Sequence, residues 1–135
     1  MIGGGPDKHP DSSMFKECRQ LVEIDGGYEL FRTSGLNYPR LGHSACSVGN
    51  SAIVVSGTKF GNMGTCEYLD IASNDWIELP TLREPRYYHS SCCFEGRYVY
   101  VFGGATGTGR YLSSIEMLEI GRIMSSDYAF TGKAA

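Results

Sequence analysis

Residues 85–104, P-R-Y-Y-H-S-S-C-C-F-E-G-R-Y-V-Y-V-F-G-G, decide the fold, because they have the pattern of one complete β-hairpin. The first arm, 89–94, is small and mixed, whereas the second arm, 97–102, is a β-branched and aromatic run that favours a buried strand. Between the arms, Glu95-Gly96 supplies a two-residue loop with a glycine for positive φ, which a tight hairpin needs. The hairpin ends at Gly103-Gly104, where no side chain hinders a sharp exit of the chain.

The same unit occurs once upstream. Residues 39–46, P-R-L-G-H-S-A-C, match 85–92, P-R-Y-Y-H-S-S-C, and each matched pair is 46 positions apart (85 − 39, 92 − 46). The hairpin loop recurs as Gly49-Asn50, and the apolar arm recurs as A-I-V-V-S-G at 52–57. A fixed period of this length is the signature of a repeat architecture.

The middle repeat is complete and serves as the template for the others. After its hairpin the sequence has a glycine-bearing loop at 58–64, a strand at 65–71, a turn at 73–75 and a fourth strand at 76–79 that Pro80 ends. The pattern therefore predicts four short antiparallel strands in each period. The first repeat lacks its opening strand, since the sequence starts on an apolar-to-glycine tail and a polar loop before two strands, 16–23 and 28–31.

Leucines mark equivalent positions on the third strand of each repeat. Leu21, Leu69 and Leu118 are spaced 48 and 49 positions apart (69 − 21, 118 − 69). Tyr28 and Trp76 each follow their leucine by seven residues, so we expect the two aromatic side chains to fill the same wedge-shaped site. In the third repeat the corresponding residue is a serine, so the pattern breaks there.

Composition and charge exclude several classes of partner. The 135 residues are 41% hydrophobic and 20% charged, as in a globular domain, and the net charge is −3 without a basic cluster. We therefore expect neither nucleic acid nor a membrane surface as a partner. No signal-peptide pattern is visible, and the longest apolar run, 98–102, is too short to span a bilayer.

The five cysteines predict a structural role. Cys46 and Cys92 are repeat equivalents, Cys18 and Cys66 are 48 positions apart (66 − 18), and with Cys93 they form no C-x-x-C pair. Such cysteines behave as small apolar residues on strands. This interpretation implies a reducing compartment, so we expect a cytoplasmic protein.

Taken together, these residues resemble the kelch repeat. Its Arg-x-x-His opening matches at residues 40–43 and 86–89, its diglycine matches at 103–104, and its third-strand acids and later tryptophan match in the middle repeat. The repeat positions are Arg40, His43, Gly57, Glu67, Leu69, Asp70, Trp76, Arg86, His89, Gly103, Gly104, Glu116 and Leu118. The sequence departs from the family pattern at Ser56-Gly57, at both third-strand leucines and in the third repeat, which has no tryptophan.

The resemblance implies an all-β fold of antiparallel four-stranded kelch blades that form a partial β-propeller. This propeller would cover residues 1–120, with blades at about 1–38 (incomplete), 39–84 and 85–130. A divergent C-terminal tail at 121–135 would follow, frayed from residue 131.

The predicted arc is too short to close by itself. A propeller has four to eight blades, whereas 135 residues at this period give fewer than three. The chain is then a piece of a longer protein, part of an assembly completed by another chain or by self-association, or an arc capped by its own tails. The start in mid-repeat favours the first.

Three patterns that could indicate chemistry have structural interpretations. His43 and His89 follow an arginine by three at equivalent places, without Asp or Cys at zinc spacing, so we expect each imidazole to bond backbone near the loop between blades. The glycine-rich run 103–109 lacks the Lys-Ser/Thr of a phosphate loop and no helix pattern follows it. The acids at strand ends, turns and alternating positions are expected to be solvated: Asp70, Asp75, Glu78 and Glu116.

The sequence therefore predicts a protein-interaction module, with no cofactor and no enzymatic activity. By resemblance, such propellers recruit substrates to ubiquitin ligases, bind the cytoskeleton or act as adaptors and scaffolds. The alternatives are a structural subunit of a larger assembly and a fragment of a kelch-type copper oxidase, for which no ligand set can be matched.

Loops displayed by a rigid sheet are where such scaffolds bind. The predicted partner contacts are Lys59, Phe60, Asn62 and Met63 in the middle repeat, and Thr106, Thr108, Arg110 and Tyr111 in the next. Arg40 and Arg86 rank lower, because we expect both to pair within the fold.

Overall fold

The computed structural model describes residues 2–4, 15–49, 51–55, 64–120 and 131–133. Within these residues all regular structure is β apart from a short 3₁₀ turn at Ile120, and every strand pairing is antiparallel. The predicted all-β antiparallel class is therefore confirmed.

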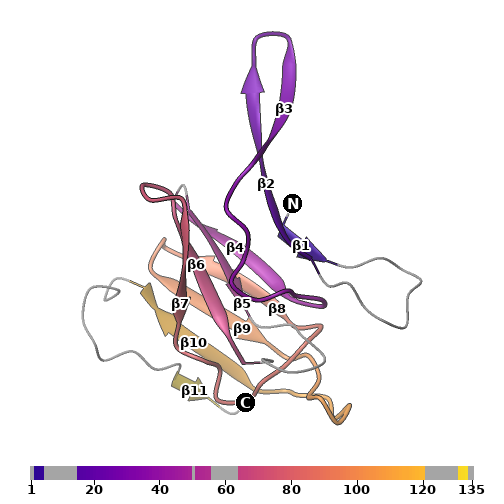
Figure 1. Cartoon of the computed structure of the whole chain (residues 1–135). Helices are drawn as coiled ribbons and strands as arrows, with labels where there is room; N and C mark the ends of the chain where they lie inside the picture. Colours follow the sequence, from indigo (N-terminus) through magenta and orange to yellow (C-terminus); the bar gives the residue numbers. More distant parts are fainter. Residues whose placement is uncertain (1, 5–14, 50, 56–63, 121–130, 134–135) are drawn as a thin grey trace.

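The strands form three sheets that follow one another along the chain (Figure 1). The first sheet contains β1 (Ile2–Gly4), β2 (Phe15–Ile24) and β3 (Gly27–Arg32) in that order. The second sheet contains β4 (Ser44–Val48), β5 (Ser51–Val55), β6 (Cys66–Asp70) and β7 (Asp75–Leu79). The third sheet contains β8 (Ser90–Phe94), β9 (Tyr98–Phe102), β10 (Ile115–Glu119) and β11 (Thr131–Lys133).

The β8–β9 hairpin forms as predicted, but its loop is one residue longer, because Phe94 pairs with Tyr98 and leaves three residues, 95–97, between the strands. The β8–β9 turn places Glu95 at φ 53° and Gly96 at φ 62°, so both central residues have the positive φ of a tight hairpin turn. Asn74 takes φ 57° at the end of the β6–β7 turn, where asparagine tolerates the left-handed region.

Residues 131–133 correct one expectation, because they form β11 and are not frayed. The strand pairs with β10 over three residues, from Ile115 opposite Lys133 to Met117 opposite Thr131. Without β11, the outer edge of β10 would present unpaired backbone groups, which a folded sheet avoids.

Two apolar interfaces join successive sheets. Between the first and second sheets, Cys18 and Leu36 pack against Trp76 and Leu69. Between the second and third sheets, the interface is larger and joins Cys66, Leu82, Val99, Val101, Leu118 and Ile120, with Cys46, Val48, Tyr68 and Leu79 at its margin. Leu69 and Leu118 thus occupy equivalent places, each packed against the preceding sheet, with Leu118 buried and Leu69 half-buried.

Tyr28 does not fill the site of Trp76, so this prediction was wrong. Trp76 is 7% exposed and lies opposite Leu69, whereas Tyr28 is 66% exposed and lies opposite Glu23. The reason is the position of the turn: β2 continues for three residues beyond Leu21 before its turn, whereas β6 continues for only one residue beyond Leu69. A spacing of seven residues therefore reaches the cross-strand partner only in the middle repeat.

The second glycine of the diglycine is required by close packing. Gly104 has φ +88°, and a Cβ at this position would lie 2.7 Å from the Tyr87 carbonyl oxygen and 2.8 Å from the His89 Cβ. The chain leaving β9 therefore passes directly over the segment that leads into β8, and the adjacent Tyr87–Ala105 bridge holds it there.

Trp76→Ala tests the interface between the first and second sheets. We expect a loss of about 3–5 kcal/mol in the free energy of unfolding, because truncating a buried indole leaves a cavity. Ile77→Ala, on the exposed neighbouring residue, is the matched control and should cost much less. Equal losses for the two variants in chemical unfolding would show that Trp76 is not a buried contact.

Candidate functional site

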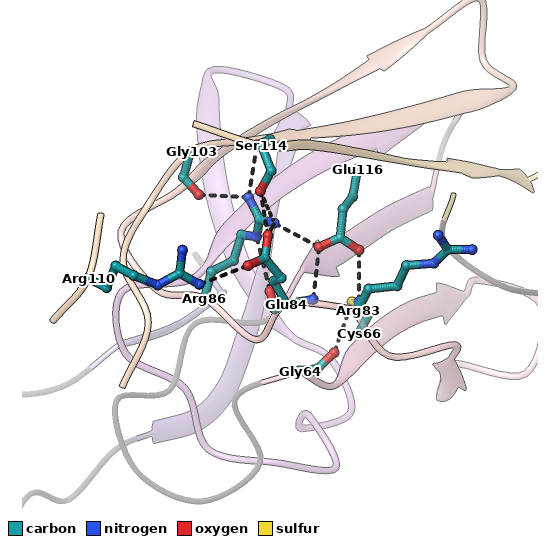
Figure 2. A network of polar contacts seen from close by, with 9 residues as sticks. All are labelled: Gly64, Cys66, Arg83, Glu84, Arg86, Gly103, Arg110, Ser114 and Glu116. Carbon is teal, nitrogen blue, oxygen red and sulfur yellow. Dashed lines mark hydrogen bonds and ion pairs between the residues drawn. The ribbon is translucent and has the colours of Figure 1, made fainter. Parts of the chain in front are cut away.

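A buried ion pair between Arg86 and Glu116 anchors the segment between the second and third sheets (Figure 2). Arg86 Nη2 lies 2.7 Å from Glu116 Oε1, and both side chains are buried. The carboxylate also accepts the backbone N–H of Arg83 at 2.8 Å and that of Glu84 at 3.1 Å. We call this arrangement the Arg86–Glu116 clamp.

The guanidinium of Arg86 also fixes the ends of two strands of its own sheet. Its Nη1 donates to the carbonyl oxygens of Gly103, at 2.9 Å, and Ser114, at 3.1 Å. These residues follow β9 and precede β10, so the arginine ties the start of the repeat to the strand ends beside the β9–β10 loop.

The second repeat contains the same clamp. Arg40 Nη2 lies 3.2 Å from Glu67 Oε1, with both side chains fully buried. Glu67 accepts the backbone N–H groups of Asn37 at 3.1 Å and Tyr38 at 3.0 Å, and Arg40 Nη1 donates to the Thr65 carbonyl at 2.7 Å. Each donor in the connecting segment lies 46 positions before its counterpart in the next repeat (83 − 37, 84 − 38, 86 − 40). The prediction that Arg40 and Arg86 pair within the fold is therefore confirmed.

The predicted solvation of Glu116 was wrong. A carboxylate at an alternating strand position is normally solvent-facing, but here a guanidinium and two backbone N–H groups replace its water. Asp70 instead closes the β6–β7 turn by accepting the Ala72 N–H and the Ser73 hydroxyl, each at 3.0 Å. Glu78 accepts the Tyr38 hydroxyl at 2.6 Å on the surface, and Asp75 is exposed.

The first sheet has no equivalent clamp among the described residues. Arg19 stands 48 positions before Glu67 (67 − 19), where the clamp needs an acid, and its Nη2 lies 2.7 Å from Glu17 on the exposed surface. Arg32 approaches the same carboxylate at 3.3 Å. The first repeat therefore differs in chemistry as well as in strand number.

His43 and His89 lie at equivalent places, directly before β4 and β8. The Nδ1 atom of each imidazole is buried. His89 is buried and His43 is half-buried, and the hydrogen bond of each imidazole to backbone stays a prediction.

The β9–β10 loop and the segment after β7 together form a hollow at one end of the sheets. Its volume is 370 Å³, and we call it the rim hollow; it is lined by Arg83, Glu84, Pro85, Thr106, Gly107, Thr108 and Arg110. Three of the predicted partner contacts, Thr106, Thr108 and Arg110, therefore lie together around one cavity.

The loop on one side of the rim hollow is held by its own backbone. The Thr106 N–H donates to the Arg110 carbonyl at 2.9 Å, and the Gly109 N–H donates to the Thr106 carbonyl at 2.8 Å. A bridge between Ala105 and Tyr111 closes the loop at its base. The hollow is therefore largely pre-formed and does not depend on a ligand to order it.

Charged groups link the rim hollow to the Arg86–Glu116 clamp (Figure 2). Glu84 accepts the Ser114 hydroxyl at 2.8 Å and an Arg110 N–H at 2.9 Å. These hydrogen bonds, from Ser114 first and then Arg110, hold the pKa of the Glu84 carboxyl below its ordinary value. Glu84 is therefore ionised at neutral pH and orients Arg110 across the hollow.

Tyr111 is 88% exposed and stands beside this loop. An aromatic side chain this exposed at the base of an ordered loop is available for a partner. The other four predicted contacts, Lys59, Phe60, Asn62 and Met63, lie outside the described residues, as does Gly57.

Sequence reasoning missed Arg83, Glu84 and Pro85 as parts of the hollow. A signal was present in the repeat itself, because Glu84 directly precedes the third repeat at the place where Tyr38 precedes the middle one (84 − 38 = 46). Both residues donate a backbone N–H to a clamp. Because the clamp uses only their backbone, their side chains can differ. A residue that departs from its repeat equivalent at such a position is a candidate for a specialised surface role.

All five cysteines are thiols outside any disulfide, and burial explains the clearest pKa shift among them. Desolvation, followed by the proximity of Cys93, raises the pKa of the Cys46 thiol to about 11. The thiolate is therefore rare at neutral pH. Among the described residues, no three His, Cys, Asp or Glu side chains are grouped as metal ligands, and none of these residues belongs to a helix of the length and hydropathy that crossing a membrane requires.

Comparison with known proteins agrees with the repeat pattern. No protein-family profile matches the chain. The human protein Kelch-like protein 34 is 29% identical over 97 residues, which span 62% of this chain and 15% of that protein. The solved structure of YjhT, a kelch-type β-propeller, matches with a TM-score of 0.69 at 12% identity, over 86% of this chain and 38% of that chain. The fold is thus of the β-propeller type, and the chain spans a minor part of each relative.

Glu116→Gln tests the clamp. We expect a loss of about 3–5 kcal/mol in the free energy of unfolding, because the variant leaves the buried Arg86 without its counter-charge. Glu119 lies on the same strand as Glu116 and forms an exposed ion pair with Arg97. Glu119→Gln, which removes this pair, should cost about 1 kcal/mol or less. Chemical unfolding measures both losses. Equal losses in the free energy of unfolding for the two variants would contradict a stabilising role for the clamp.

Proposed function

Because the chain carries divergent, partial kelch repeats, we propose that it is a protein–protein interaction module that acts as an adaptor or scaffold. The proposal assigns it no enzymatic activity and no cofactor. We further propose that it works in the cytoplasm, where its five thiols stay reduced.

The observation that supports this proposal most directly is the rim hollow. It brings Thr106, Thr108 and Arg110 together beside the exposed Tyr111. Arginine and tyrosine are the residue types most often found as binding hot spots, and a pre-formed loop loses little entropy on binding. The hollow therefore combines suitable contact chemistry with rigidity.

The clamp contributes to binding only by positioning Arg110, and it does not contact the partner itself. Arg86 holds Ser114, and Ser114 holds Glu84, which in turn orients Arg110. A partner that engages Arg110 therefore meets a side chain whose direction is already set by buried contacts.

Affinity capture from cytoplasm tests the proposal with the double variant Arg110→Ala, Tyr111→Ala. We expect proteins that the wild-type chain enriches to bind the variant at least about 30-fold more weakly, equivalent to a hot-spot loss of about 2 kcal/mol. The affinity is then measured with the purified partner.

Ile71→Ala serves as the matched control. Ile71 is an exposed apolar residue in the β6–β7 turn, at the opposite end of the sheets from the rim hollow. This variant should retain every partner. Partners that bind the double variant as tightly as the wild type would refute the rim hollow as the contact surface.

A further inference from the structure

The third sheet exposes an aromatic face on the side away from the second sheet. Val99 and Val101 of β9 point into the buried interface, so the alternate residues Tyr98, Tyr100 and Phe102 occupy the other face. Tyr100 stacks on Phe102 with ring centroids 6.2 Å apart, and Tyr98 lies 6.5 Å from Tyr100. Phe94, opposite Tyr98 in β8, is 55% exposed. We call these four residues the trailing face.

The first sheet exposes an apolar face at the other end of the arc. Cys18 of β2 points into the interface with the second sheet, so Leu21 lies on the opposite face, with Leu30 directly across from it in β3. Leu21 is 60% exposed, and Leu30 and Tyr28 on the same face are also exposed. These three residues form the leading face, and Figure 1 shows that their hairpin extends beyond the other sheets.

The internal interfaces show what each face is built to contact. Cys46 and Val48 of the second sheet pack against the core of the third, and their repeat equivalents in the third sheet are Cys92 and Phe94 (92 − 46, 94 − 48). The leading face has the opposite role: half-buried Leu69 packs against the sheet before its own, and Leu21 is its repeat equivalent. Each exposed face thus repeats one half of an interface that the molecule already forms.

We propose that the leading face of one copy of this chain packs on the trailing face of a second copy, and the reverse, so that two arcs close into one ring. Each copy supplies three sheets, and six sheets fall within the four to eight that a propeller needs. The contact is head-to-tail, and such contacts form a closed ring when the rotation between copies completes a circle.

A second copy fits both exposed faces at once. It brings Leu21, the equivalent of the leucines that pack at both internal interfaces, and it brings an aromatic face to cover the Leu21 of the first copy. Exposed apolar faces of this kind mark interaction surfaces, and the proposed ring buries both of them in each copy. The proposal concerns the 135-residue chain and is independent of the rim hollow.

Sedimentation and light scattering of the 135-residue chain test the proposal. We expect a species of twice the chain mass of 14.8 kDa at micromolar concentration. Leu21→Glu on the leading face and Phe94→Glu on the trailing face should each raise the dimer Kd by at least about tenfold. Ile71→Glu, which puts the same charge on an exposed residue outside both faces, should leave the Kd unchanged.

Mixing the two variants distinguishes this contact from a symmetric one. A Leu21→Glu chain keeps an intact trailing face and a Phe94→Glu chain keeps an intact leading face, so their mixture should regain association that neither has alone. Circular dichroism checks that each variant is folded. A monomeric wild-type chain, assemblies that lengthen with concentration, a Kd unaffected by either substitution, or a mixture that stays monomeric would each overturn the proposal.

Discussion

Two buried arginine–glutamate pairs constrain this structure more than any other contact. Removing a charge from water costs several kcal/mol, so each pair is tolerated only because the carboxylate also accepts two backbone N–H groups. Apolar side chains of similar volume could stabilise the core equally well. They could not bind those N–H groups, so the specific contribution of Glu67 and Glu116 is to fix where the chain passes from one sheet to the next.

That constraint sets both the packing and the surface. With the connecting segments fixed, Leu36 and Leu82 are placed in the two apolar interfaces. The Leu36 N–H donates to the Lys16 carbonyl at the start of β2, and the Leu82 N–H donates to the Gly64 carbonyl just before β6. At the same end of the sheets, the segment held by Glu116 forms one wall of the rim hollow. Stability and the proposed binding surface therefore depend on the same few polar contacts.

Short-range patterns made the hairpins, the strand order and the burial of Trp76 predictable, since alternation and turn residues act locally. The burial of Glu116 was not, because its partner Arg86 lies 30 positions away in a connecting segment. The repeat contained a signal for this ion pair, because Arg40 recurs as Arg86 and Glu67 recurs as Glu116. Glu116 considered by itself gave no such signal. The prediction for Tyr28 failed for another reason: β2 runs further past Leu21 than β6 runs past Leu69, so the cross-strand partner of the leucine changes. The sequence predicted three residues of the rim hollow, Thr106, Thr108 and Arg110. The opposite wall, residues 83–85, could be identified only from the tertiary structure.

Amide hydrogen exchange in the two connecting segments tests the central claim most directly. Asn37, Tyr38, Arg83 and Glu84 lie outside any strand, yet each donates its N–H to a buried carboxylate. Their amides should therefore exchange as slowly as those of the central strands, and Glu116→Gln should speed exchange at the last two more than at the first two. Exchange of all four at the rate of exposed loops, while the strands stay protected, would contradict the account.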